Sequence, residues 1–134
     1  MSQEYVDAVR RSIDGWNRDD FDACVSIAHP EIEWVSDLAI RMHGPEAVYR
    51  GVEGIRRYWD EWHELWAVRL DVTEMIDSGD TVVVLAQTRA LGDASGVEFK
   101  QLIAYVYEFE DGLARRVRSY HDPDRAFEAV GLRR

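Results

Sequence analysis

The stretch VEFKQLIAYVYEFEDGLARRVRSYHDPDRAFEAVG, residues 97–131, decides the predicted fold. Residues 97–109 and 113–120 are rich in β-branched and aromatic side chains, which predicts two strands. Asp111-Gly112 between them is typical of a tight hairpin turn. A short helix follows at once, so the second strand stops just before Asp122, an acidic residue between a strand and a helix. If the protein does chemistry, we expect Asp122 to take part in it.

The rest of the chain shows helical periodicity first and strand patterns later. Tyr5, Val6, Val9, Ile13 and Trp16 recur at three- and four-residue steps, which places them on one face of a helix. An aromatic apolar face marks a second strong helix, and β-branched runs separated by turn residues mark the strands. We predict helices over 3–16, 21–28, 51–65 and 124–130, strands over 31–35, 67–76, 81–91, 97–109 and 113–120, and a loop over 36–50.

Helices followed by four consecutive antiparallel strands indicate the α+β class. We expect one domain, 1–134, in which a curved, mixed sheet of about five strands wraps around three helices and ends in a short helix. Such a sheet forms a cone, and the interior of a cone favours a pocket for an apolar small molecule.

The charge and the cysteine content exclude several classes of partner and compartment. A net charge of −10 disfavours nucleic acid and anionic membrane, because phosphate demands a basic surface. The single cysteine, Cys24, cannot form an internal disulfide and is expected to be a buried structural thiol. The chain has no signal-peptide pattern and no spanning apolar run, so we expect a cytoplasmic protein.

Strand alternation provides the candidate site. Arg118, Tyr120 and Asp122 share one face of the last strand, and Gln101 and Tyr105 share a face of the strand before it. If Asp122 faces the cone interior, the pocket holds a carboxylate, a phenol and a guanidinium. Below them would lie an apolar floor of Trp34, Trp59 and Trp62. Tryptophans at such spacing are also common core residues, so ligand contact and core packing both remain open.

Two roles are open for Asp122. A carboxylate in an apolar pocket beside an arginine can serve as a base near neutral pH, with Tyr105 or Tyr120 donating a hydrogen bond to a developing enolate oxygen. The alternative is structural: Asp122 caps the terminal helix, with Pro123 in its first position.

Metal and cofactor motifs are missing from the sequence. The four histidines are scattered and lack the paired spacing of a zinc helix. No P-loop, dinucleotide fingerprint or nucleophile elbow is found. We therefore predict no metal and no cofactor.

Six stretches carry a family resemblance: HPEIEW (29–34), YRGVEGI (49–55), GDTVVV (79–84), DGL (111–113), RSYHD (118–122) and AFEAVGL (126–132). With these motifs the chain resembles the SnoaL-like branch of the NTF2-like superfamily, which includes polyketide cyclases and ketosteroid isomerases. The resemblance implies the cone fold and places Asp122 at the cyclases' catalytic aspartate, and Asp37 lies near the isomerases' base.

The same resemblance leaves two functions open and suggests an assembly. One function is a cofactor-free cyclase or isomerase that moves a proton next to a carbonyl, and the other is a non-catalytic small-molecule-binding module. Family members usually form homodimers through the outer sheet face. Here that face is expected to carry Val82, Leu102, Val106 and Val117.

Overall fold

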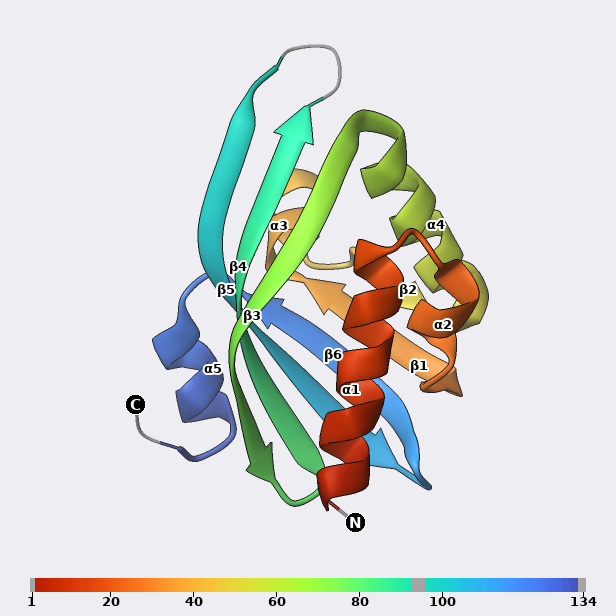
Figure 1. The fold of residues 1–134 in the computed structure, drawn as a ribbon, viewed down its shortest axis with the longest axis vertical. Helices are drawn as coiled ribbons and strands as arrows, with labels where there is room; N and C mark the ends of the chain where they lie inside the picture. The colour runs from red at the N-terminus through yellow and green to blue at the C-terminus, as the bar shows by residue number, and fades with distance from the viewer. Residues whose placement is uncertain (1, 93–95, 133–134) are drawn as a thin grey trace.

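A curved sheet of six strands forms the centre of the fold (Figure 1). The structure is a computed structural model that describes residues 2–92 and 96–132, and the counts of strands and helices refer to these residues. The strands are β1 (Ala28–Ser36), β2 (Val48–Arg50), β3 (Trp66–Ser78), β4 (Thr81–Gly92), β5 (Glu98–Glu110) and β6 (Leu113–Tyr120).

The sheet has the order β2-β1-β6-β5-β4-β3. Strands β3 to β6 pair antiparallel in succession, as predicted, and β1 joins the sheet by pairing parallel to β6. The turn between β5 and β6 has positive φ at both central residues, 55° at Asp111 and 81° at Gly112. This geometry matches the right-handed twist of the two strands, and it confirms the predicted hairpin.

Five helices accompany the sheet within the described residues. Helices α1, α2 and α4 cover its inner face, whereas α5 packs on the outer face (Figure 1). The mixed α+β class and the terminal helix are therefore confirmed. The helices are α1 (Ser2–Asn17), α2 (Phe21–Val25), α3 (Asp37–His43), α4 (Gly51–Leu65) and α5 (Pro123–Ala129).

The predicted loop over 36–50 is wrong, because this segment contains α3 and β2. The Ser36 hydroxyl accepts a hydrogen bond from Ala39 N at 3.3 Å and so caps α3. The predicted second helix is also too long: α2 ends at Val25, and β1 already begins at Ala28. Pro30 fits this strand because the pairing of β1 with β6 is interrupted between Ala28 and Glu33, so its missing N–H breaks no ladder bond.

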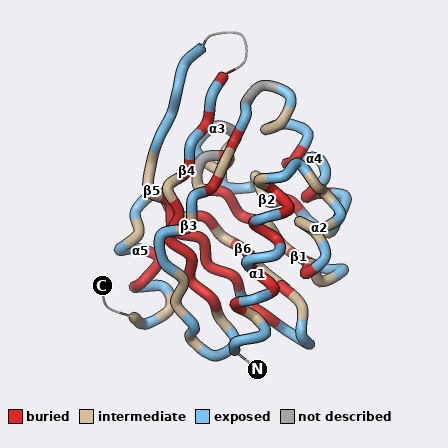
Figure 2. Tube along the Cα trace, in the orientation of Figure 1, coloured by how far each residue is buried: buried red, intermediate tan, exposed pale blue. Residues whose placement is uncertain are grey.

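Two apolar clusters lie on the two faces of the sheet, and Figure 2 shows the buried residues concentrated in its middle. The inner cluster joins α1 and α4 to the sheet, and the outer one seats Phe127 of α5. Val82 and Val117, expected on the outer face, belong to the inner cluster, while Val106 and Leu102 lie outside. The homodimer stays a prediction.

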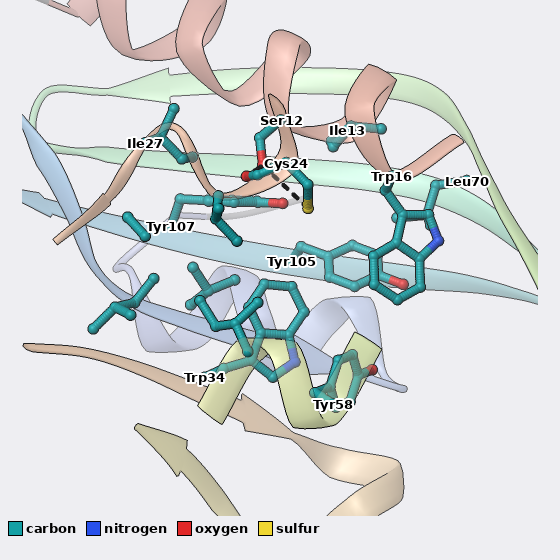
Figure 3. A pocket seen from close by; sticks show the side chains of 15 residues that line it. Ser12, Ile13, Trp16, Cys24, Ile27, Trp34, Tyr58, Leu70, Tyr105 and Tyr107 are labelled. Atoms are coloured by element: carbon teal, nitrogen blue, oxygen red, sulfur yellow. Dashed lines mark hydrogen bonds between the residues drawn. The ribbon is translucent and has the colours of Figure 1, made fainter. Parts of the chain in front are cut away.

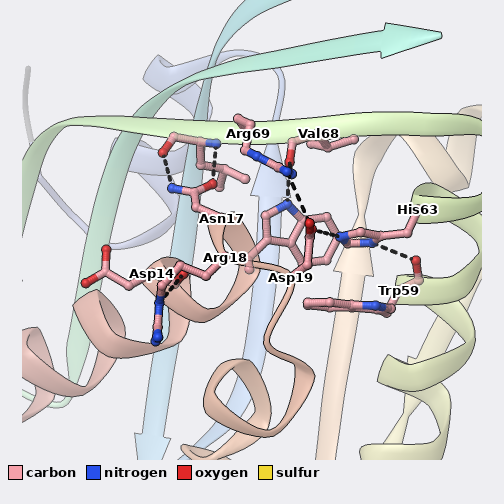
Figure 4. Close-up of polar contacts among 10 residues, drawn as sticks. Asp14, Asn17, Arg18, Asp19, Trp59, His63, Val68 and Arg69 are labelled. Atoms are coloured by element: carbon pink, nitrogen blue, oxygen red, sulfur yellow. Dashed lines mark hydrogen bonds and ion pairs between the residues drawn. The ribbon is translucent and has the colours of Figure 1, made fainter. Parts of the chain in front are cut away.

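Polar contacts hold the end of α1 against β3 and α4 (Figure 4). Asn17 Nδ2 donates to Leu70 O at 2.8 Å, and Leu70 N donates to Asn17 Oδ1 at 2.9 Å. The Asp19 carboxylate, on a residue with a φ of 58°, lies 3.2 Å from His63 Nε2 and 3.3 Å from Arg69 Nη2. These contacts fix the helices that roof the interior. No described helix has the length and apolar character needed to span a bilayer.

Candidate functional site

A cavity of about 280 Å³ lies between α4, the end of β1 and the inner face of strands β4 to β6. Its walls are largely aromatic and aliphatic, with a few hydroxyl groups and one imidazole. Such a mixture, apolar walls with a few convergent polar groups, is typical of small-molecule sites. The lining residues are Ser36, Tyr58, Trp62, Thr88, Ala90, Phe99, Ile103, Tyr105, Ser119 and His121.

His121 provides the imidazole, just beyond the end of β6. Its backbone is held on both sides: its N–H donates to Asp37 Oδ2 at 3.2 Å, and its carbonyl accepts from Gln101 Nε2 at 3.2 Å. Burial and the positive charge of Arg41 lower the pKa of His121 below its usual 6.5, against the opposing effect of Asp37. The imidazole is therefore neutral at pH 7 and can accept a proton.

Tyr58 and Tyr105 supply two phenols in the same cavity. Burial raises the pKa of Tyr58 to about 12, although the Ser36 and Trp34 side chains lower it. Burial also raises the pKa of Tyr105 well above its usual 10, and its hydroxyl lies 3.0 Å from Thr88 Oγ1. Both phenols stay protonated over the physiological range, so they can donate hydrogen bonds to a ligand oxygen.

A second, smaller cavity of about 50 Å³ lies deeper, under α1 and α2 (Figure 3). Tyr58 and Tyr105 line this deep cavity as well as the larger one. Ser12 Oγ donates to Cys24 O at 2.6 Å, and burial raises the pKa of the Cys24 thiol to about 11. Cys24 is thus a neutral thiol in an apolar setting, as expected of a structural cysteine.

The structure places some predicted site residues at these cavities and others away from them. Tyr105 lines both cavities, Trp62 lines the larger and Trp34 the deep one. Trp59 lines neither: it is 6% exposed and packs in the core, with its ring stacked on His63 at 4.1 Å. Gln101 also lines neither, but it contacts the site through the His121 carbonyl.

Arg118, Tyr120 and Asp122 lie on the opposite side of β6 from both cavities. Arg118 Nη2 donates to Asp37 Oδ1 at 3.2 Å, and its guanidinium stacks 4.7 Å from the centre of the Tyr120 ring. The exposed Asp122 caps α5, its Oδ1 accepting from Asp124 N at 3.0 Å. The capping role of Asp122 is therefore confirmed.

The inner face of β6 carries Val117, Ser119 and, just past the strand, His121. The alternation of side chains along the strand correctly groups these three residues. It does not indicate whether this group or the group of Arg118, Tyr120 and Asp122 faces inward. Arg116 and Arg118 were the available signal, because two charged residues at alternate positions favour the solvent side of a sheet. Sequence reasoning also missed Tyr58, Thr88, Ser36 and Phe99 as lining residues, since their positions depend on packing between distant elements.

Neither cavity is lined by a carboxylate among the described residues. In the same part of the chain, no group of three or more His, Cys, Asp or Glu side chains is arranged to hold a metal ion. The ionisable chemistry of the larger cavity therefore rests on His121, with phenols and aliphatic hydroxyls around it.

Comparisons with known proteins agree with this architecture. An NTF2-like protein of unknown function from Burkholderia pseudomallei superposes with a TM-score of 0.80 at 21% identity, covering 97% of this chain and 98% of that one. TerC, co-crystallised with polyporic acid, gives 0.79 at 23% identity, covering 96% and 98%. A putative SnoaL-like polyketide cyclase from Jannaschia sp. CCS1 gives 0.76 at 19% identity, covering 96% and 92%.

At these identities the solved structures establish the fold, and sequence comparison supplies the family. No match is found among curated proteins. The model of the SnoaL-like domain family matches residues 9–117, well over half of the chain. The protein therefore belongs to the SnoaL-like domain family and has its NTF2-like α+β fold.

Proposed function

We propose that the protein binds a mostly apolar carbonyl compound in the larger cavity and moves a proton at the carbon next to the carbonyl, without a cofactor. The observation that carries this proposal is the neutral imidazole of His121 at a cavity that also holds two protonated phenols. A base and hydrogen-bond donors for an oxyanion are the two elements that enolisation needs.

In the proposed step, His121 takes a proton from the carbon beside the carbonyl. The electrons of that C–H bond form the C=C bond of an enolate, and the negative charge develops on oxygen. Tyr58 or Tyr105 donates a hydrogen bond to this oxygen. In D₂O the proton on the imidazolium is replaced by a deuteron from the solvent, and delivery of that deuteron to the same carbon completes exchange. Delivery of a proton to another carbon of the enolate completes isomerisation. Positioned general acid–base catalysis of this kind contributes a factor of about 10²–10⁴ in rate.

The size of the cavity suggests the size of the ligand. A cavity of about 150 Å³ accommodates benzene, which corresponds to roughly 25 Å³ per carbon. The 280 Å³ of the larger cavity then suits about eleven non-hydrogen atoms, or two fused rings. Aromatic walls from Tyr58, Trp62, Phe99 and Tyr105 favour a flat ring system. The bicyclic ketone 1-tetralone meets these requirements and is a suitable probe.

Deuterium exchange at C2 of 1-tetralone in D₂O, followed by NMR, tests the proposal. We expect the wild-type protein to accelerate exchange above the buffer rate, and His121→Gln to lose that acceleration by a factor of about 10²–10⁴ while the affinity for 1-tetralone persists. Asp122→Asn is the matched comparison, because Asp122 is next in sequence but lies on the surface. Equal acceleration by wild type and His121→Gln would rule out the role of His121.

A second candidate is a binding protein that does no chemistry. Among the described residues, no carboxylate lines either cavity, so His121 is the one lining group there that can exchange a proton near neutral pH. A site with so little acid–base chemistry favours binding without catalysis. Isothermal titration separates the two candidates. A binding module would hold 1-tetralone with normal affinity and show no exchange above the buffer rate.

A further inference from the structure

We infer that the deep cavity is a subsite of the same ligand site and takes a short alkyl group of one or two carbons. The group would be carried by the ligand at the end opposite its carbonyl. This inference rests on the proposed ligand class, and it adds a second specificity element that is separate from the proton-transfer step.

Four elements show that the two cavities lie along one axis. On β5, Tyr107 lines the deep cavity, Tyr105 lines both and Ile103 lines the larger cavity. Tyr105 and Tyr107 face Ser119 and Val117 of β6 in the strand register. In β6 the order is the same, with Val117 at the deep cavity and Ser119 at the larger one.

The facing elements repeat this order. In α4, Ile55 lines the deep cavity, Tyr58 lines both and Trp62 lines the larger one. In β1, Trp34 lines the deep cavity and Ser36 the larger one. Tyr58 and Tyr105 therefore lie where the two cavities adjoin, and their side chains line both.

The length of this interior matches a substituted bicyclic ligand. His121 lies at the larger end, four residues beyond Val117 at the deep end. At about 3.4 Å per residue these positions are about 14 Å apart along the strand direction. A bicyclic ketone whose carbonyl is near His121 would thus direct its far ring edge past Tyr58 and Tyr105 toward the deep cavity.

The chemistry of the deep cavity selects an apolar group. Most of its lining residues are aliphatic or aromatic. Three of its polar groups are engaged within the protein: Ser12 Oγ donates to Cys24 O, Trp16 Nε1 donates to Val68 O, and the Tyr105 hydroxyl lies 3.0 Å from Thr88 Oγ1. Among the described residues, the buried Trp34 Nε1 has no hydrogen-bond partner. Figure 3 shows the lining side chains around the space, with Ser12 and Cys24 on one side and Trp34 and Tyr58 on the other. At roughly 25 Å³ per carbon, its 50 Å³ accommodates about two carbons.

Calorimetric affinities for 1-tetralone and its 6-methyl, 6-ethyl and 6-butyl derivatives test the subsite. Position 6 lies across the ring system from the carbonyl. We expect the affinity to rise about fourfold per carbon up to ethyl and to fall for butyl. The isomer 8-ethyl-1-tetralone carries its alkyl group beside the carbonyl, so its affinity should not exceed that of 1-tetralone.

Ala28 is a partly buried residue that lines the deep cavity, so larger side chains at this position fill it. Ala28→Leu should remove the gain from both methyl and ethyl, and the milder Ala28→Val should remove the gain from ethyl. Ala67→Leu, on an exposed strand position, is the matched control and should keep the wild-type series. Circular dichroism verifies that each variant is folded. The affinities measured with the wild-type protein test the subsite even if a variant does not fold.

Each outcome bears on a separate claim. Equal affinities across the 6-alkyl series, or unchanged gains in folded Ala28→Leu, would overturn the subsite while the proposed function stands. His121→Gln tests the two claims separately. If this variant keeps the wild-type gains in affinity from the 6-alkyl groups but loses the deuterium exchange, both the subsite and the role of His121 as base are supported. If none of the tetralones binds, the ligand class is wrong and the subsite is overturned with it.

Discussion

Replacing Gly15 by alanine tests the packing of α1 on α2, which forms the roof of the deep cavity. Gly15 is a buried residue of α1, and a Cβ atom there would lie 2.5 Å from Cys24 N and 2.9 Å from both the carbonyl carbon and the Cβ of Ala23. These distances are shorter than van der Waals contact. Two of the three atoms belong to the backbone of α2, so no side-chain rotation relieves the overlap.

Two effects of opposite sign decide the outcome of Gly15→Ala. Helix propensity alone favours alanine over glycine by about 1 kcal/mol. Overpacking costs about 1–3 kcal/mol, and a backbone clash belongs at the upper end of that range. We therefore expect the free energy of unfolding to fall by about 1–2 kcal/mol, which for a domain of this size lowers the Tm by about 3–6 °C.

Urea unfolding monitored by far-UV circular dichroism measures this change. Asp14→Ala is the control, because Asp14 is the exposed neighbour of Gly15 on the same helix and its substitution should change stability by less than about 0.5 kcal/mol. A Gly15→Ala protein that is more stable than wild type would show that α1 and α2 are not in close contact.

Three further predictions follow from the site. Asp122→Ala should lower the free energy of unfolding by about 1 kcal/mol in urea titrations through loss of the α5 cap, with tetralone affinity retained; lost affinity would contradict its surface position. Cys24, with a pKa of about 11 rather than 9, should react with iodoacetamide at pH 8 about 100-fold more slowly than an ordinary cysteine, and rapid labelling would refute its burial. Because the pKa of His121 is lowered in the folded protein, the neutral His121 contributes its full stability above pH 6.5, and this stability is lost as the pH falls through the folded pKa. The urea midpoint of wild type should therefore fall more between pH 7 and 5 than the urea midpoint of His121→Gln.

Much of the fold could be predicted because local chemistry determines it. Asp111-Gly112 accepts the positive φ angles of a tight hairpin, and the alternation of β5 correctly places Ile103, Tyr105 and Tyr107 on one face. The segment 36–50 could not be predicted in the same way. Its helix and strand are too short for a periodic signal, and β2 is defined by its pairing with β1.

The candidate site was harder to predict from the sequence, because the tertiary structure decides which side chains face the cavity. Alternation divides β6 into two sets, and the packing of Val117 against the helices decides which set faces inward. That packing places His121 at the cavity and leaves Asp122 to cap α5. Family resemblance pointed to the acid, whereas burial and cavity shape point to its neighbour in sequence.

The pH dependence of C2 exchange in 1-tetralone, combined with an NMR titration of His121, tests the central claim most directly. The His121 signal is assigned by its absence from the spectrum of His121→Gln. We predict that the protein-dependent rate falls as the pH is lowered, with a midpoint below 6.5 that coincides with the NMR midpoint of His121. A rate that is constant between pH 5 and 8, or a midpoint that differs from that of His121, would contradict the assignment of His121 as the base.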